Sequence, residues 1–242
     1  MPEIHLDAAD GAGRFACHVV MPSPNPAPAV VVLQDIFGGN ANMRAICDWV
    51  ASMGFIAIAP DLFWRQEAGV QLDPDAGQAQ WERAFALMKG MDQDKAMLDI
   101  QATINHARGM AGGSGKVGTM GFCLGGRLAF KAALETDADA NVSYYGVGLE
   151  GLVGGALRGP VLVHIAEKDH FVPDAAKAAI QAALEGERDT MLLRAETGDA
   201  SAGPALERAL QAATKLRGAV EVVPPGSLPN DGKVIDDVRK YT

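Results

Sequence analysis

The chain has few cysteines and no long apolar run. These two features argue against a disulfide-rich protein and against a membrane-spanning protein. Its 242 residues include three cysteines, Cys17, Cys47 and Cys123, an odd and sparse set that fits a reducing compartment better than a disulfide framework. The longest apolar runs are about six to eight residues, too short to span a bilayer. Residues 1–5 lack the basic and apolar segments of a signal peptide. We therefore expect a soluble, cytoplasmic protein without a membrane anchor.

Basic residues are outnumbered by acidic residues, and common metal-binding motifs are also missing. The formal net charge is −9, from 21 Lys and Arg against 30 Asp and Glu, and no basic patch occurs. This balance argues against nucleic acid and anionic membranes as partners. The sequence has neither a CxxC pair nor an HExxH motif, so we expect neither a metal nor another cofactor. The expected partner is a small molecule, and the expected assembly is a monomer or a dimer.

The composition and the order of elements indicate an α/β protein. Hydrophobic residues make up 48% of the chain and charged residues 21%, a globular balance. Short apolar runs alternate with helical patterns, which is typical of a largely parallel sheet covered by helices on both faces. Strands are expected at residues 18–21, 29–33, 54–59, 116–120, 141–145 and 160–165, and helices at residues 42–52, 78–89, 93–108, 124–134 and 174–184.

A glycine-rich turn stands between one of these strands and the next helix. Residues 121–126 read Gly-Phe-Cys-Leu-Gly-Gly, the Gly-x-nucleophile-x-Gly pattern of a nucleophile elbow with Cys123 at its centre. The flanking glycines leave room where a sharp strand-to-helix turn brings backbones close together. A cysteine at a helix N-terminus is favoured as a thiolate by the helix dipole. The alternative is a buried, inert cysteine.

Two carboxylates also follow predicted strands. Asp35 comes after residues 29–33, and Asp169 comes after residues 160–165. Because the carboxyl ends of parallel strands share one edge of a sheet, we expect both to gather near Cys123. The alternative for Asp169 is the N-cap of the following helix.

These segments together resemble the dienelactone hydrolase family of the α/β-hydrolase fold. The resemblance covers about residues 3 to 184, and it is carried by residues 121–126, 31–38, 59–63 and 165–173 in that family's order. It implies hydrolysis of a lactone or another small ester by a Cys–His–Asp triad. Cys123 matches the family's nucleophile and Asp169 its triad acid. Asp35 stands where the family usually has a glutamate, thought to interact with the resting thiol.

The resemblance also implies an oxyanion hole and a covalent route. The thiol would attack the ester carbonyl and form a thioester, which water then hydrolyses. Backbone N–H groups of Leu124 and of Ile36 or Phe37 would hold the oxyanion.

The triad base has no match at the family's position. The family places its histidine in the loop after the strand that follows Asp169, here residues 196–203, and no histidine occurs from residue 171 to residue 242. His164 lies in a predicted strand, where a histidine is most often a core residue. His170 is the nearest other candidate, but its backbone neighbours that of Asp169, which makes a triad geometry hard to form. The sequence therefore predicts an incomplete triad, with His170 as a weak candidate base.

The end of the chain differs from a hydrolase. Residues 188–242 resemble the last stretch of phenylacetate–CoA ligase-type enzymes, most specifically at residues 225–234, where Lys233 matches the lysine that contacts an acyl-adenylate. We accordingly divide the chain into a hydrolase-like domain at residues 1–187 and an atypical segment at residues 188–242. Residues 191–195 are predicted to add a strand to the sheet. The alternative is an ordinary, divergent hydrolase terminus.

The sequence supports three hypotheses about function. The first is a thiol hydrolase of lactones or small esters, impaired by the missing histidine. The second is an inactive protein of the same fold that binds a small acid or an acyl-CoA. The third is a hydrolase joined to a ligase-like tail that has an interaction role.

Overall fold

The computed structural model describes residues 3–23, 26–185, 191–214 and 218–228. The chain divides into two compact units, Met1–Ala183 and Leu184–Thr242. Each unit is described by itself.

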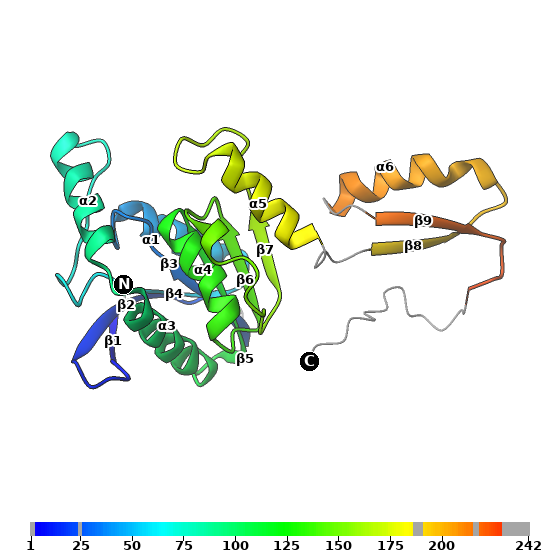
Figure 1. Ribbon diagram of the computed structural model, residues 1–242. Coiled ribbons are helices and arrows are strands. Elements are labelled where there is room, and N and C mark those ends of the chain that lie inside the picture. Colours follow the sequence, from blue (N-terminus) through cyan, green and yellow to red (C-terminus); the bar gives the residue numbers. More distant parts are fainter. Residues whose placement is uncertain (1–2, 24–25, 186–190, 215–217, 229–242) are drawn as a thin grey trace. The chain divides into compact units, whose positions relative to one another are not determined.

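The first unit is built on a seven-stranded sheet. Its strand order is β1-β2-β4-β3-β5-β6-β7, and the pairs from β4 through β7 are parallel, whereas β2 runs antiparallel to β1 and to β4 (Figure 1). The strands are β1 (Glu3–Asp7), β2 (Arg14–Val20), β3 (Ala27–Leu33), β4 (Ile56–Pro60), β5 (Gly113–Phe122), β6 (Ala140–Tyr144) and β7 (Val161–His164).

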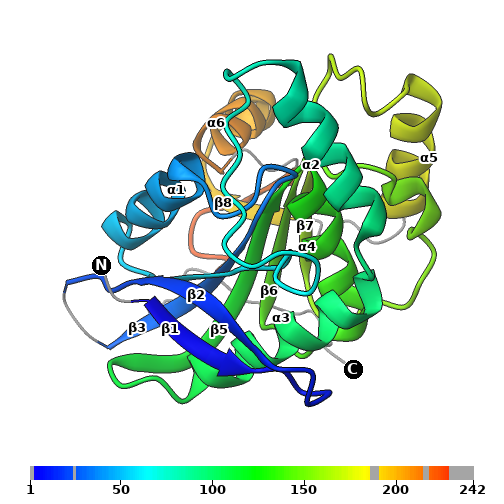
Figure 2. The same ribbon diagram turned by 90° about the vertical axis from the view of Figure 1, so that its left-hand side faces the viewer.

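Helices cover both faces of this sheet. They are α1 (Ala41–Ser52), α2 (Gln78–Gly90), α3 (Gln93–Arg108), α4 (Leu124–Glu135) and α5 (Asp174–Glu185). One core cluster joins the sheet to α3 and α4, and a second joins it to α1, so α1 lies across the sheet from α3 and α4 (Figure 2). The predicted mostly parallel sheet with helices on both faces is confirmed.

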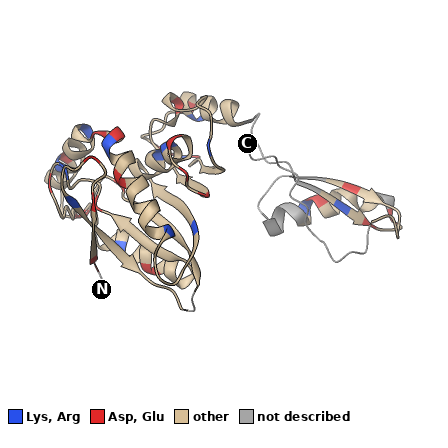
Figure 3. Ribbon diagram, turned by 90° about the horizontal axis from the view of Figure 1, so that it is seen from below, with Lys and Arg blue, Asp and Glu red and all other residues tan. Residues whose placement is uncertain are grey.

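The sequence of β3 shows why both faces of the main sheet are apolar. Side chains alternate between the faces of a strand, and Val31 and Leu33 join the α3–α4 cluster while Val32 joins the α1 cluster. All three are fully buried. A central parallel strand covered on both faces therefore reads as a continuous apolar run. Charged residues are correspondingly rare on the central strands (Figure 3).

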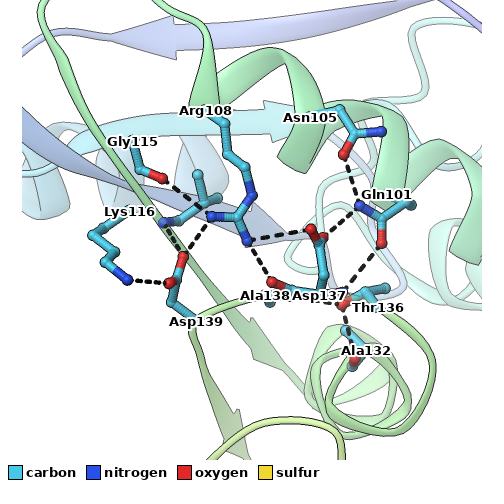
Figure 4. A network of polar contacts seen from close by, with 11 residues as sticks. Gln101, Asn105, Arg108, Gly115, Lys116, Ala132, Thr136, Asp137, Ala138 and Asp139 are labelled. Carbon is cyan, nitrogen blue, oxygen red and sulfur yellow. Dashed lines mark hydrogen bonds and ion pairs between the residues drawn. The ribbon is translucent and has the colours of Figure 1, made fainter.

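A polar network ties the far end of β5 to two helices. Arg108, at the end of α3, donates to the Gly115 carbonyl and to Asp139 in the α4–β6 loop, which also accepts from Lys116 and from the Val117 N–H (Figure 4). Burial alone raises the pKa of Asp139, but the bonds from Lys116, Val117 and Arg108 outweigh it and bring the pKa to about 2. The network links the beginning of β5 to the end of α3 and to the α4–β6 loop.

None of the helices within the described ranges is long and apolar enough to cross a membrane.

The second unit contains β8 (Met191–Glu196), α6 (Gly203–Thr214) and β9 (Gly218–Val223). β8 and β9 pair in parallel over their whole lengths, from Met191 opposite Gly218 to Glu196 opposite Val223. The prediction that residues 191–195 form a strand is confirmed, and their addition to the main sheet stays a prediction. A helix between two parallel strands, here α6 between β8 and β9, is the usual crossover connection.

Candidate active site

The predicted elbow is present where β5 passes into α4. Cys123 connects the two elements at φ 54° and ψ −113°, a left-handed conformation that costs a non-glycine residue energy. The neighbouring glycines are required by close backbone contacts. A Cβ on Gly121 would lie 2.1 Å from the Gly125 carbonyl oxygen, and one on Gly125 would lie 2.2 Å from that of Leu33. The turn therefore presses α4 directly against β3 and holds the thiol in a strained position.

The thiol is not activated as the sequence suggested. Burial raises the pKa of Cys123, a hydrogen bond from the Leu124 N–H lowers it, and the charges of Asp35 and Asp169 raise it again, with a net increase. The expectation of a thiolate stabilised at the helix N-terminus is thus wrong. The helix provides a favourable N–H group, but desolvation and two negative charges outweigh it. Cys17 and Cys47 are fully buried, and burial raises the pKa of each to about 12.

Asp35 lies in the loop after β3, beside the elbow. Its Oδ1 accepts the Phe37 N–H at 2.8 Å. Burial raises the pKa of Asp35, and the bond from Phe37 offsets only part of the increase. A carboxylate with a raised pKa is a stronger base than an exposed one.

Asp169 lies in the loop after β7 and is partly exposed. Its Oδ1 accepts the Phe171 N–H at 2.8 Å, which closes a turn two residues long. The helix α5 begins only at Asp174, so Asp169 does not cap it. The charges of Asp35 and Asp169 both act on the Cys123 thiol, so three side chains singled out in the sequence share one edge of the sheet.

Comparison with known proteins identifies the family. The sequence profile of the dienelactone hydrolase family matches residues 15–194. The chain belongs to the dienelactone hydrolase family. The predicted membership of a hydrolase family is therefore confirmed.

Individual proteins with similar sequences or structures support the same family assignment. The chain is 50% identical over 190 residues to a protein of Azospirillum brasilense named as a candidate carboxymethylenebutenolidase, covering 77% of this chain and 80% of that one. It is 41% identical over 172 residues to a carboxymethylenebutenolidase of Pseudomonas putida, covering 70% and 72%. A solved structure from Klebsiella pneumoniae, a candidate dienelactone hydrolase, superposes with a TM-score of 0.60 at 22% identity, covering 93% of this chain and 85% of that one. This likeness confirms the predicted α/β-hydrolase fold.

The family profile ends at residue 194, before most of the atypical segment. The likeness of residues 188–242 to a ligase tail therefore stays a prediction. Lys233 lies outside the described residues.

Among the described residues, no hydrogen bond joins a histidine side chain to Cys123 or to Asp169. His170 is exposed, and among the described side chains no hydrogen bond links it to Asp169, whose Oδ1 accepts from Phe171 instead. His164 is exposed rather than buried, contrary to the sequence-based expectation. Its imidazole stacks on Tyr144, with ring centroids 4.5 Å apart and planes 3° apart.

Sequence reasoning missed Tyr145, which follows β6 at the same edge. Its φ is 40°, and besides Cys123 it is the one described non-glycine residue with a positive φ. Burial raises the pKa of its phenol, as do the charges of Cys123, Asp35 and Asp169. Tyr145 and Asp169 also line one small cavity. The available signal was position, because Tyr145 directly follows a strand as Cys123 does.

The candidate oxyanion donors lie just after β5 and just after β3. Leu124 is the first residue of α4, and its N–H bonds the resting thiol. Ile36 is buried in the loop after β3. The Phe37 N–H is already committed to Asp35. Within the described ranges, no group of three or more His, Cys, Asp and Glu side chains is placed to hold a metal ion.

Proposed function

We propose that this chain hydrolyses a lactone or a small carboxylate ester through a covalent thioester on Cys123. The observation that carries the proposal is the strained position of Cys123 at the β5–α4 turn, beside two carboxylates, in a member of the dienelactone hydrolase family. Strain at a single non-glycine residue persists when the surrounding structure enforces it, and it concentrates at functional sites.

The chemistry follows from the groups beside the thiol. The Cys123 sulfur attacks the ester carbonyl, and the carbonyl π electrons move onto oxygen to form a tetrahedral oxyanion. The carbonyl re-forms as the C–O bond to the alcohol breaks, the alcohol oxygen takes the proton that was removed from the thiol, and a thioester remains. Water then attacks the thioester, which releases the carboxylic acid and returns a proton to the Cys123 sulfur. The Leu124 N–H, released from the thiol, and the Ile36 N–H are the donors we assign to the oxyanion. Ile36 is preferred to Phe37 because the Phe37 N–H is bonded to Asp35.

We assign the removal of the thiol proton to Asp35. It is partly buried, its charge acts on the thiol, and its raised pKa makes it a better acceptor than an exposed aspartate. Asp169, whose charge also acts on the thiol, would stabilise the imidazolium if His170 accepted a proton during the reaction. Among the described imidazoles, His170 is exposed next to Asp169, and His164 lines the same small cavity as Asp169. Because general base catalysis contributes about a hundred- to ten-thousandfold, we expect hydrolysis of the thioester to be the slow step.

The test is hydrolysis of 4-nitrophenyl acetate and of an unsubstituted butenolide by the wild-type chain and by Cys123→Ala. We expect Cys123→Ala to reduce turnover to the rate of the buffer, and Asp35→Asn to reduce it by at least tenfold. Cys17→Ala is the matched control, since that thiol is fully buried in the core. Turnover by Cys123→Ala equal to that of the wild type would falsify the proposal.

A second candidate function is binding of a small acid or an acyl-CoA without turnover. The raised pKa of Cys123 favours it, because a protonated thiol is a poor nucleophile. It predicts ligand-dependent thermal stabilisation that Cys123→Ala retains, together with no Cys123-dependent hydrolysis. Melting curves that do not change across small carboxylates, lactones and acyl-CoA compounds would exclude it.

A further inference from the structure

The chain has five histidines, and three of them lie far from the elbow. His5 is in β1 and His18 is in β2, and both β4 and β3 stand between β2 and β5 in the sheet. His106 lies in the last turn of α3, which precedes the beginning of β5. Cys123 follows the other end of β5, a strand of ten residues or about 30 Å. These three imidazoles are therefore too distant to act on a group bound to Cys123.

The other two histidines are nearer, but neither is held at the thiol. The His164 imidazole stacks on Tyr144, and Tyr144 stacks in turn on Phe122, with ring centroids 4.5 and 4.9 Å apart. Because these residues stand opposite one another on β7, β6 and β5, the Tyr144 ring separates the imidazole from β5. His170 is exposed, and among the described residues no hydrogen bond joins it to Cys123. The base beside the thiol is therefore a carboxylate rather than an imidazole.

The two halves of the proposed reaction depend differently on a base. Water has a pKa of about 15.7, so its attack on the Cys123 thioester needs a group that removes a proton in the same step. An imidazole is suited to that role at neutral pH, and a carboxylate is a weaker base. A thiol with an ordinary pKa of about 8.5 is already partly ionised at pH 8, and its thiolate attacks without a base. The lack of an imidazole at the elbow therefore slows water far more than it slows a thiolate.

The groups that are present at the elbow serve either nucleophile. The N–H groups of Leu124, the first residue of α4, and of Ile36 are the donors assigned to the oxyanion. The tetrahedral intermediate carries its oxyanion on the acyl carbon whether water or a thiolate attacks, so both reactions use the same donors. Cys123 is half-buried, and Tyr145, which follows β6 at the same edge, is 43% exposed. A small solute can therefore reach an acyl group on the Cys123 sulfur.

We infer that this chain is an acyltransferase for small thiols, which take the acyl group from Cys123 in preference to water. The inference rests on the proposed function of Cys123. The acceptor thiol loses its proton to the solvent, and its sulfur attacks the carbonyl carbon of the thioester and forms a new C–S bond. The carbonyl re-forms as the C–S bond to Cys123 breaks, and the Cys123 thiolate takes a proton from the solvent. The two halves together convert an ester and a thiol into an alcohol and a thioester, without oxidation and without consuming water.

A single-turnover experiment on the acylated protein tests the inference. The wild-type chain is acylated with 4-nitrophenyl hexanoate, the excess ester is removed by gel filtration, and N-acetylcysteamine is added at pH 8. Intact mass follows the hexanoyl group on the protein, and chromatography separates S-hexanoyl-N-acetylcysteamine from hexanoic acid. We expect the thiol to accelerate loss of the hexanoyl group by about tenfold or more, with the thioester as the main product. Loss at an unchanged rate, with hexanoic acid as the product, would overturn the inference.

Two matched controls test whether the sulfur and the fold are both needed. N-acetylethanolamine differs from N-acetylcysteamine only by an oxygen in place of the sulfur, and we expect it to leave the rate unchanged because its hydroxyl needs a base. Acceleration by the alcohol equal to that by the thiol would contradict the inference. The acylated Cys123 peptide, released by pepsin, carries the same thioester without the oxyanion donors. Because one such donor contributes about a hundredfold or more, we expect exchange in the folded protein to be at least about tenfold faster than in the peptide. Equal rates would also overturn the inference.

The outcomes separate this inference from the proposed function. A chain that never gains a hexanoyl group on Cys123 contradicts the proposed function and removes the acyl donor with it. An acylated Cys123 whose hexanoyl group passes only to water leaves the proposed function intact and contradicts this inference alone. Cys17→Ala, which removes a fully buried thiol, should transfer the hexanoyl group as the wild type does, whereas Cys123→Ala should form no thioester.

Discussion

The close approach of α4 to β3 makes Gly125 a sharp test of the elbow. A Cβ at Gly125 would lie 2.2 Å from the Leu33 carbonyl oxygen and 2.7 Å from that of Gln34, and both obstacles are backbone atoms. Overpacking usually costs about 1–3 kcal/mol, and a backbone obstacle belongs at or above the top of that range. Alanine in a helix recovers up to about 1 kcal/mol relative to glycine. We therefore expect Gly125→Ala to lower the free energy of unfolding by at least about 2 kcal/mol.

Tryptophan fluorescence during thermal unfolding is the suitable assay. All three tryptophans, Trp49, Trp64 and Trp81, lie in the first unit, so the signal reports on that unit alone. For a domain of this size, about 2 kcal/mol corresponds to a decrease in Tm of roughly 4–8 °C. Gly151→Ala is the matched control, because a Cβ there meets no atom within 4 Å, and we expect a change within about 0.5 kcal/mol. Equal Tm values for the two variants would refute the packing argument at the elbow.

Three further outcomes are expected. Asp139→Asn should destabilise the first unit at pH 7 by on the order of 2 kcal/mol at most, because its pKa is lowered to about 2. Because folding lowers the pKa of Asp139, its contribution to the free energy of unfolding is present above about pH 4 and is lost as the pH falls toward about 2. Fluorescence melts of the wild type and of Asp139→Asn at pH 7 and pH 3 check that the difference in Tm between the two proteins is smaller at pH 3. Asp35→Asn should accelerate alkylation of Cys123 by iodoacetamide about three- to tenfold at pH 8, since removing a negative charge lowers the pKa of the thiol; an unchanged or slower rate counts against that coupling. Cys17 and Cys47, both fully buried, should be alkylated only on unfolding, which peptide mapping after brief labelling tests, and native labelling at all three thiols contradicts it.

Much of the fold was predictable because the apolar periodicity is strong. The helices at residues 93–108 and 78–89 were predicted within one residue of α3 (Gln93–Arg108) and α2 (Gln78–Gly90). β1 (Glu3–Asp7) was missed, because it is an edge strand of five residues in which only Leu6 is buried. Edge strands lack the continuous apolar run that identifies β3.

The site was predictable in position but not in electrostatics. Asp35, Cys123 and Asp169 could be grouped from the alternation of strands and helices, since parallel strands place their carboxyl ends together. The pKa of Cys123 could not be predicted, because it depends on burial and on charges brought in from two other loops. The pairing of β8 with β9 was also missed, since a short apolar run does not specify its partner strand.

The most direct test of the central claim is the mass of the protein after mixing with 4-nitrophenyl hexanoate. Because no triad histidine is placed among the described residues, acylation should outpace hydrolysis of the thioester. The account predicts a burst of nitrophenol, a mass increase of one hexanoyl group, and its location on Cys123 by peptide mapping. Turnover without an acylated Cys123, or a hexanoyl group on another residue that persists in Cys123→Ala, contradicts it.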